Sequence, residues 1–274
     1  MSDVDYNAVD PFELAREAAD YIAQRSGIAK HDVALVLGSG WGAAADLIGE
    51  TVAEVPAADV PGFHAPAVAG HVPVMRSIGI GDSDRHALVL GSRTHYYEGR
   101  GVRAVAHPIR TAAATGAKTM VLTNGCGGLN PDWSPGQVVL LRDHINLTAD
   151  SPLEGATFID LTDLYSQRLR DLAHGVDETL PEGVYVQFRG PHYETPAEVK
   201  MAGIIGGDLV GMSTTLEAIA AREAGMEILG LSLMTNLAAG ISANPLSHQE
   251  VIEAGQEASG RIAQLLADIV RRLD

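Results

Sequence analysis

Several polar residues of this 274-residue chain stand directly after short apolar runs whose length and composition are typical of buried strands. In open α/β sheets, ligands bind beyond the carboxyl ends of the strands, so residues in such positions meet even when they are far apart in sequence. The residues in these positions are Ser39, Arg93 with His95, Asn124, Met212 with Ser213, and Asn236. The sequence therefore predicts one ligand site assembled from distant strand ends.

The chemistry of this set favours an oxyanion as ligand. Arg93 offers a planar fork of donors that suits phosphate, and Ser39 and Ser213 each add a hydroxyl. Ser213 directly precedes a helix predicted to start at Thr214, where backbone N–H groups favour an anion. The glycine-rich segments at 38–42 and 123–131 leave further backbone N–H groups accessible to a ligand.

The first of these glycine turns also fits a second interpretation. Residues 38–43 read GSGWGA after an apolar strand, which satisfies the G-x-G-x-x-A fingerprint of dinucleotide-binding folds. Asp59 lies 19 residues after Gly40, near the place where such folds carry an acidic residue for the ribose. The spacing alone therefore leaves an NAD-binding dehydrogenase open beside an oxyanion site.

The elements that must position these residues alternate between strands and helices. Branched apolar runs predict strands that start near residues 33, 87, 119, 138, 184, 209 and 228, and helical patterns lie between them. This alternation indicates an α/β fold with a largely parallel sheet. No linker or repeat divides the chain, and residues 82–86 (DSDRH) have the composition of a hairpin tip. We therefore expect residues 1–274 to form a single domain.

Capping residues mark the predicted helix boundaries. Asp10 is placed as the N-cap of a first helix that Gly27 ends. Thr-x-x-Glu capping boxes open two further helices at Thr195 and Thr214, and a Ser-x-x-Glu box opens the C-terminal helix at Ser247.

Composition excludes several classes of function. With 19 basic and 35 acidic residues the net charge is −16, which disfavours a nucleic-acid or anionic-membrane partner. No apolar run approaches the ~20 residues of a membrane helix, and the acidic start MSDVDYNAVD does not resemble a signal peptide. The single cysteine, Cys126, cannot form an intrachain disulfide and is predicted to be a small core residue. A soluble, cytoplasmic protein is the expectation.

The chain resembles the trimeric, low-molecular-mass purine nucleoside phosphorylases. The motifs that carry the resemblance occur in the same order between about residues 33 and 255: LGSGWG, GSRTHYYEG, TNGCGGLNP, LRDHINLT, GPHYETPAE, VGMSTTLEA, MTN and SHQEV. The dinucleotide interpretation leaves all but the first of them unexplained. The resemblance implies a single α/β domain around a mixed, partly barrel-like sheet, and a homotrimer that serves purine salvage. It also implies reversible phosphorolysis of a purine nucleoside, with inorganic phosphate as co-substrate and no metal or organic cofactor.

The resemblance assigns roles residue by residue. The phosphate site would comprise Ser39, His71, Arg93, His95, Ser213 and the backbone near Asn124 and Gly125. The base would meet Tyr193, Glu194 and Asn236, and the ribose would meet Tyr97, Met212 and His248. Phe158 would reach into the pocket of a neighbouring subunit. Asn236, Glu194 and His95 would be the catalytic residues.

Two of these residues bear on substrate choice. Asn236 can donate to N7 of the leaving base, and an ionised Glu194 can accept from N1–H of a 6-oxopurine such as hypoxanthine or guanine. The alternative on the same fold is 5′-methylthioadenosine phosphorylase, which would use an aspartate near position 236 and an apolar residue near 248. Asn236 and His248 favour inosine and guanosine. A further alternative, from another class, is a binding protein that has kept the pocket and lost the reaction.

Overall fold

The computed structural model describes residues 4–64, 74–91, 93–241 and 248–273. Nine strands form one mixed sheet in the order β2-β3-β4-β1-β5-β8-β7-β6-β9. The strands are β1 (Val33–Val36), β2 (Thr51–Pro56), β3 (Val74–Gly79), β4 (His86–Leu90), β5 (Thr119–Gly128), β6 (Val138–Asn146), β7 (Glu182–Gln187), β8 (Leu209–Gly211) and β9 (Glu227–Leu237).

The last strand closes part of this sheet on itself. β9 pairs antiparallel with β6. It also pairs in parallel with β5, along the whole length of β5 from Thr119 to Gly128. Strands β5, β8, β7, β6 and β9 therefore form a closed five-stranded barrel, from which β1, β4, β3 and β2 extend as an open sheet. Closure satisfies the backbone groups that an edge strand would leave unpaired.

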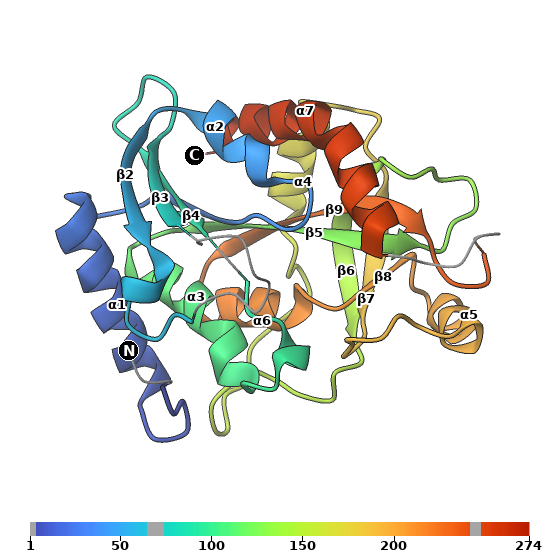
Figure 1. Cartoon of the computed structure of the whole chain (residues 1–274), viewed down its shortest axis with the longest axis horizontal. Coiled ribbons are helices and arrows are strands. Elements are labelled where there is room, and N and C mark those ends of the chain that lie inside the picture. The colour runs from blue at the N-terminus through green and yellow to red at the C-terminus, as the bar shows by residue number, and fades with distance from the viewer. Residues whose placement is uncertain (1–3, 65–73, 92, 242–247, 274) are drawn as a thin grey trace.

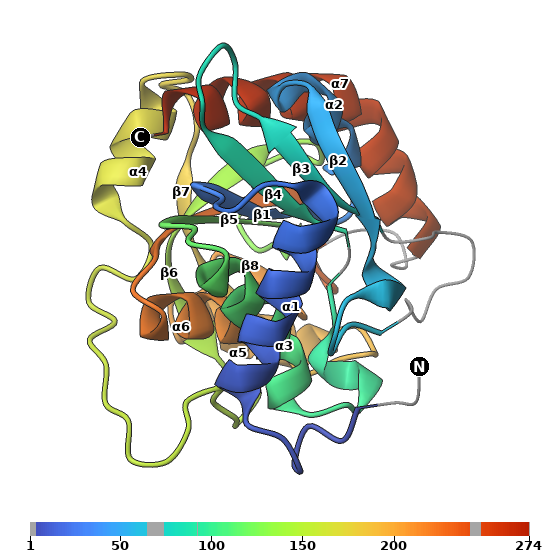
Figure 2. The ribbon, with the colours of Figure 1, turned by 90° about the vertical axis from the view of Figure 1, so that its left-hand side faces the viewer.

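Helices cover both faces of the extended sheet. They are α1 (Pro11–Ser26), α2 (Ala45–Ile48), α3 (Val102–Ala114), α4 (Gln167–His174), α5 (Pro196–Ile204), α6 (Thr215–Glu223) and α7 (His248–Arg272), with short 3-10 turns at Gly42–Ala44, Ala57–Asp59 and Tyr96–Glu98. Figure 1 shows α7 and α2 above the sheet and α1, α3 and α6 below it, and Figure 2 shows α1 lying across α3. Within the described residues, no helix combines the length and the apolar character needed to span a bilayer.

Strand β1 shows why this layered arrangement forms. Its four residues are all buried, because it lies between β4 and β5 and has helices on both faces. Ala34 and Val36 pack into the core shared with α1, α3 and α6, whereas Val33 and Leu35 pack into the core shared with α2, α4 and α7. The alternation of side chains along a strand thus supplies two cores from one continuous apolar run.

The predicted helix caps are confirmed where the structure describes them. The Asp10 carboxylate accepts from the N–H groups of Phe12 and Glu13, and Gly27 ends α1 with φ of 74°. Both Thr-x-x-Glu capping boxes are present, at the starts of α5 and α6. The predicted cap at Ser247 lies outside the described residues.

The structure differs from the sequence-based expectation in the sheet and agrees with it in one connection. The sheet is mixed and not largely parallel, because β2, β3, β6 and β8 each pair antiparallel with a neighbour. Strands β2 and β3 were not predicted, since the half-exposed edge strand β2 lacks a continuous apolar run. The segment after the first glycine turn forms only a 3-10 turn and the four-residue α2. Residues 82–86 are confirmed as part of the β3–β4 hairpin connection.

Candidate active site

A cavity of about 410 Å³ opens where β1, β5, β8 and β9 meet the loops at 93–97 and 191–194. Its volume is in the range of about 300–1,000 Å³ that small-molecule sites occupy. The residues predicted for the site that line this cavity are Ser39, Arg93, His95, Tyr97, Asn124, Gly125, Tyr193, Glu194, Met212, Ser213 and Asn236. The prediction that distant segments meet at one site is therefore confirmed.

Three predicted residues are not placed at the cavity. His71 lies outside the described residues, as does the side chain of His248, the first residue of α7. Phe158 is 93% exposed and does not line the cavity of its own chain.

The first glycine turn owes its composition to close packing. The N–H of Gly38 donates to the Thr123 hydroxyl of β5 at 2.9 Å. A Cβ atom on Gly38 would meet the Thr123 carbonyl oxygen at 2.7 Å and the Asn124 Cα at 2.8 Å. Glycine is thus required for the turn to approach β5 and to present Ser39, whose side chain is exposed, to the cavity.

One end of the cavity is suited to an anion, and Arg93 is its central donor. The Arg93 side chain is only 6% exposed. Its Nε donates to both carboxylate oxygens of Glu217 at 2.9 Å, and its Nη1 donates to the Thr123 carbonyl at 2.9 Å. Its Nη2 is buried and has no hydrogen-bond partner among the described residues. Unsatisfied buried donors are costly, so this N–H group marks the place of a ligand acceptor.

Asn124 and the start of α6 form the floor of this anion end. The Asn124 side-chain nitrogen donates to the Thr214 hydroxyl at 3.0 Å, and its Oδ1 is buried without a partner in the described part of the chain. The hydroxyls of Ser213 and Thr214 are 3.1 Å apart. These contacts hold Ser213 at the N-terminal end of α6, beside the backbone N–H groups that favour an anion.

His95 and Tyr97 border the same end as a stacked pair. Their ring centroids are 4.7 Å apart with an interplanar angle of 14°. Glu98 fixes His95, because its Oε1 accepts from the His95 backbone N–H at 2.7 Å and lies 3.4 Å from its Nδ1. Burial by itself raises the pKa of Glu98. The hydrogen bonds from the side chain and the backbone N–H of His95 outweigh that effect, so the pKa is lowered overall. The His95 ring is thereby held in one orientation next to the tyrosine.

The other end of the cavity pairs a carboxyl group with an amide. Glu194 is 8% exposed, and its Oε1 is buried without a hydrogen-bond partner among the described groups. Burial raises the pKa of Glu194 above its usual 4.5. The Thr235 hydroxyl donates to Asn236 Oδ1 at 2.8 Å, and Asn236 Nδ2 donates to the Leu237 carbonyl at 3.0 Å. These bonds leave one amide N–H of Asn236 for a ligand.

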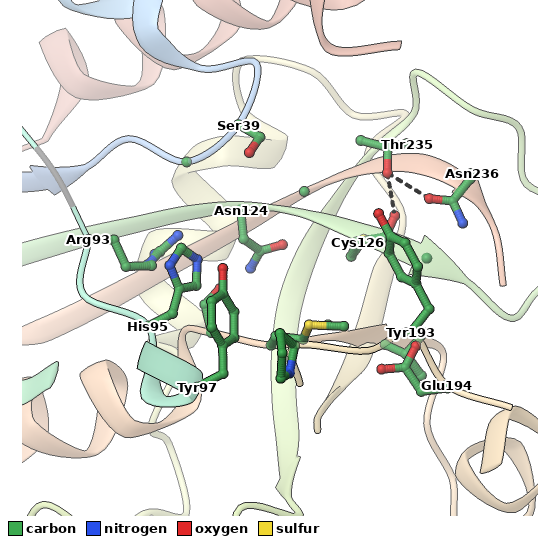
Figure 3. A pocket seen from close by; sticks show the side chains of 18 of the residues that line it. Ser39, Arg93, His95, Tyr97, Asn124, Cys126, Tyr193, Glu194, Thr235 and Asn236 are labelled. Carbon is green, nitrogen blue, oxygen red and sulfur yellow. Dashed lines mark hydrogen bonds between the residues drawn. The ribbon is translucent and has the colours of Figure 1, made fainter. Parts of the chain in front are cut away.

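Figure 3 shows this division of the cavity. Arg93 and His95 lie at one end, Glu194 and Asn236 lie at the other, and the Asn124 side chain points into the space between them. The exposed ring of Tyr193 stands beside Asn236. An anion at the first end and a flat heterocycle with N–H and ring-nitrogen groups at the second match these functional groups.

The sequence did not identify every residue of the site. The residues missed are the apolar wall formed by Pro191, Val210 and Ala238, the hydroxyl of Thr235 that orients Asn236, and Glu217. Glu217 had a local signal, the capping box with Thr214, but nothing in that pattern predicts its contact with Arg93. Thr235 is an extra residue where β9 bulges against β5, which sequence spacing does not indicate.

Asn124 and Cys126 both lie within β5. Asn124 was predicted to follow a strand end, but it lies inside β5, which continues to Gly128 because it pairs with β8 and β9. Cys126 is 4% exposed, and burial raises the pKa of its thiol to about 12. It packs in the hydrophobic core, as predicted, and also lines the cavity; a thiol whose pKa is raised in this way is poorly suited to act as a nucleophile. In the described chain, no cluster of three or more histidine, cysteine, aspartate or glutamate side chains is arranged to hold a metal ion.

Comparisons with known proteins all point to one family. Residues 32–271 match the family model of the phosphorylase superfamily. The purine nucleoside phosphorylase of Cellulomonas sp is 71% identical over 98% of this chain and 96% of its own length. That of Mycobacterium tuberculosis is 56% identical over 96% of this chain and 97% of its own.

Solved structures give the same result for the fold. A Schistosoma purine nucleoside phosphorylase in complex with hypoxanthine superimposes with a TM-score of 0.86 at 31% identity, covering 97% of this chain and 100% of that one. The Schistosoma mansoni enzyme in complex with inosine gives a TM-score of 0.86 at 31% identity, covering 96% of this chain and 97% of that one.

Proposed function

The chain belongs to the purine nucleoside phosphorylases of the phosphorylase superfamily and is a pentosyltransferase; on this premise we propose that its preferred substrates are 6-oxopurine nucleosides. Inosine, guanosine and their deoxy forms would be converted reversibly to the free base and (deoxy)ribose 1-phosphate. The observation that carries the proposal is a single cavity with two ends. At one end Arg93 has an N–H group, and at the other Glu194 has a buried oxygen beside the Asn236 amide; neither the N–H group nor the oxygen has a partner among the described residues.

The anion end would hold inorganic phosphate. Arg93 Nη2, the hydroxyls of Ser39 and Ser213, and the backbone near Asn124 and Gly125 would donate to its oxygens. His95, fixed by Glu98, would contribute a ring N–H. The family resemblance adds His71 to this set. Holding phosphate beside the sugar makes the reaction effectively intramolecular, which contributes several kcal/mol to catalysis.

The other end would bind and stabilise the leaving base. As the C1′–N9 bond breaks, positive charge develops on the sugar and negative charge on the purine. The free N–H of Asn236 would donate to N7 as this charge grows, and ionised Glu194 would accept from N1–H. A phosphate oxygen would attack C1′ from the face opposite the base, inverting the anomeric centre. Tyr193 would pack on the purine ring.

The ribose would lie between these two ends. Tyr97 and Met212 line the cavity there, and the resemblance places His248 at the 5′-hydroxyl. Asn236, where a carboxylate would suit a 6-amino base, favours this assignment over 5′-methylthioadenosine phosphorylase. Phosphate would be a co-substrate, and no metal or organic cofactor would be needed.

The assembly would be a homotrimer in the cytoplasm, acting in purine salvage. The homotrimer follows from the family resemblance, in which an aromatic side chain reaches a neighbour's pocket. Phe158, which is 93% exposed on the isolated chain, is accessible for such a contact.

One assay tests the proposed function. Purified protein is incubated with inosine, guanosine, adenosine or 5′-methylthioadenosine, with and without phosphate, and base release is followed by absorbance. We expect phosphate-dependent release from inosine and guanosine at rates far above those for the other two nucleosides. Efficient methylthioadenosine cleavage with poor inosine cleavage would refute the substrate assignment, and the absence of any cleavage would indicate a binding protein.

A further inference from the structure

Arg93 has the only arginine or lysine side chain among the described residues that line the cavity, so its direction decides where a full positive charge meets the ligand. That direction is set by Glu217, a residue outside the cavity lining. The two side chains are 6% and 3% exposed, and the pair joins segments 124 positions apart in sequence.

The geometry of this ion pair is unusual in one respect. Arginine and a carboxylate commonly form a fork in which two different N–H groups donate to the two oxygens. Here a single donor, Arg93 Nε, is shared by both oxygens of Glu217 at 2.9 Å. Nη1 is taken by the Thr123 carbonyl at 2.9 Å, and Nη2 is left without a protein partner in the described structure. The carboxylate therefore orients the guanidinium without occupying the N–H that the anion needs.

Glu217 also fixes a second part of the anion end. Its Oε2 accepts from the backbone N–H of Thr214 at 2.8 Å. Thr214 has φ of 81°, a left-handed conformation that is costly for a β-branched residue. The Thr214 hydroxyl accepts a hydrogen bond from the Asn124 side-chain amide and lies within hydrogen-bond distance of the Ser213 hydroxyl. One carboxylate thus holds both Arg93 and the N-terminal turn of α6.

We propose that Glu217 is a positioning residue for phosphate, which aims the free Nη2 of Arg93 into the cavity and balances the buried charge of the guanidinium. The inference rests on the proposed function, because it assigns the anion end to phosphate. It assigns to Glu217 a role beyond the capping of α6.

The chain offers a matched control for that distinction. At the start of α5, Glu198 makes the same capping box with Thr195, whose N–H donates to Glu198 Oε2 at 2.8 Å. Glu198 is partly exposed, and among the described residues its carboxylate has no arginine partner. Replacing Glu198 by Gln therefore removes the charge of a helix cap alone, whereas replacing Glu217 by Gln removes the same cap charge together with the carboxylate that orients Arg93.

The first experiment compares the steady-state kinetics of E217Q and E198Q for phosphate and for inosine. In E217Q the guanidinium of Arg93 is no longer held in place and loses its hydrogen bond to phosphate. A hydrogen bond between charged groups is strong enough that we expect kcat/KM for phosphate to fall by roughly 10- to 100-fold. We expect the KM of E217Q for inosine, and kcat/KM of E198Q for phosphate, to stay within about twofold of wild type. Equal phosphate kinetics in E217Q and E198Q would overturn the inference.

In a second comparison, the expected effect of E217Q on kcat/KM for phosphate has the opposite sign. This comparison does not require the E217Q single variant to fold. In R93M, the buried Glu217 carboxylate has lost its partner and repels phosphate. The double variant R93M/E217Q removes that charge, so we expect its kcat/KM for phosphate to exceed that of R93M by several-fold. If Glu217 served only as a helix cap, E217Q would reduce the activity or leave it unchanged, both in the wild-type protein and in R93M. A double variant that is no more active than R93M would therefore overturn the proposal. A wild-type protein without phosphorolysis would instead refute the proposed function before any variant is made.

Discussion

Replacing Asn236 by Asp tests the base end of the site most directly. The Asn236 amide is held by the Thr235 hydroxyl at 2.8 Å on its oxygen and by the Leu237 carbonyl at 3.0 Å on its nitrogen. Aspartate has almost the same size and can keep the Thr235 contact. It cannot donate, so it loses both the bond to Leu237 and the free N–H assigned to N7 of the base.

The expected loss follows from the role of that N–H. Removing one preorganised donor from developing negative charge costs about 2.7–4 kcal/mol of the activation barrier, or roughly 10²–10³ in kcat. We therefore expect kcat/KM of N236D for inosine to fall by about 100- to 1,000-fold. The new carboxylate accepts from a 6-amino group, so adenosine loses less, and the ratio of inosine to adenosine cleavage falls by at least about tenfold.

The assay measures base release from both nucleosides at saturating phosphate, together with KM for phosphate. Asn130→Asp is a suitable control, because Asn130 lies outside the cavity lining and its side-chain oxygen accepts from the Asp132 N–H at 3.0 Å, a bond that aspartate retains. This control should match wild type. An unchanged inosine-to-adenosine ratio in N236D would show that Asn236 does not contact the base as proposed.

Three further predictions concern pH and assembly. Because burial raises the pKa of Glu194 above 4.5, kcat/KM for inosine should decline as the pH falls through that raised value, and a pH–rate profile of E194Q should lack this decline; a profile shared by both proteins would contradict the role of the carboxylate. His31 and His107 are buried and His144 is partly buried, and this burial lowers the pKa of each to about 4 from 6.5, so the unfolded chain binds protons first as the pH falls. Each of these histidines should therefore lower the free energy of unfolding by about 2 kcal/mol when the pH is reduced from 7 to 5. Urea denaturation at the two pH values measures this loss, and equal stability at both would refute the prediction. Replacing Phe158 by Ala should raise KM for inosine but not for phosphate, and sedimentation should show that the wild-type protein is a trimer. A wild-type protein that is monomeric and fully active would contradict the proposed role of Phe158.

Much of the local structure could be predicted from the sequence, because it depends on interactions between neighbouring residues. The cap at Asp10, the stop at Gly27 and the boxes at Thr195 and Thr214 are each formed by contacts within four residues, and all are present. The edge strand β2 was missed because its half-exposed residues give no apolar run. The order of polar residues after apolar runs was enough to predict a common site, since the ends of neighbouring strands converge whatever lies between them.

The tertiary structure decided what those residues do to one another. Pairing of β9 with β5 closes the barrel, which carries β5 past Asn124 and makes a predicted strand-end residue part of a strand. Glu217 has a local partner in Thr214 that the sequence predicts, but its bond to Arg93 exists only because the segment after β4 and the start of α6 both contact β5. Such contacts join positions far apart in sequence, and no period or spacing encodes which distant side chain will satisfy a buried charge. Sequence by itself determined the local elements and the functional groups available to the site; three-dimensional packing determined which donors remain free to meet a ligand.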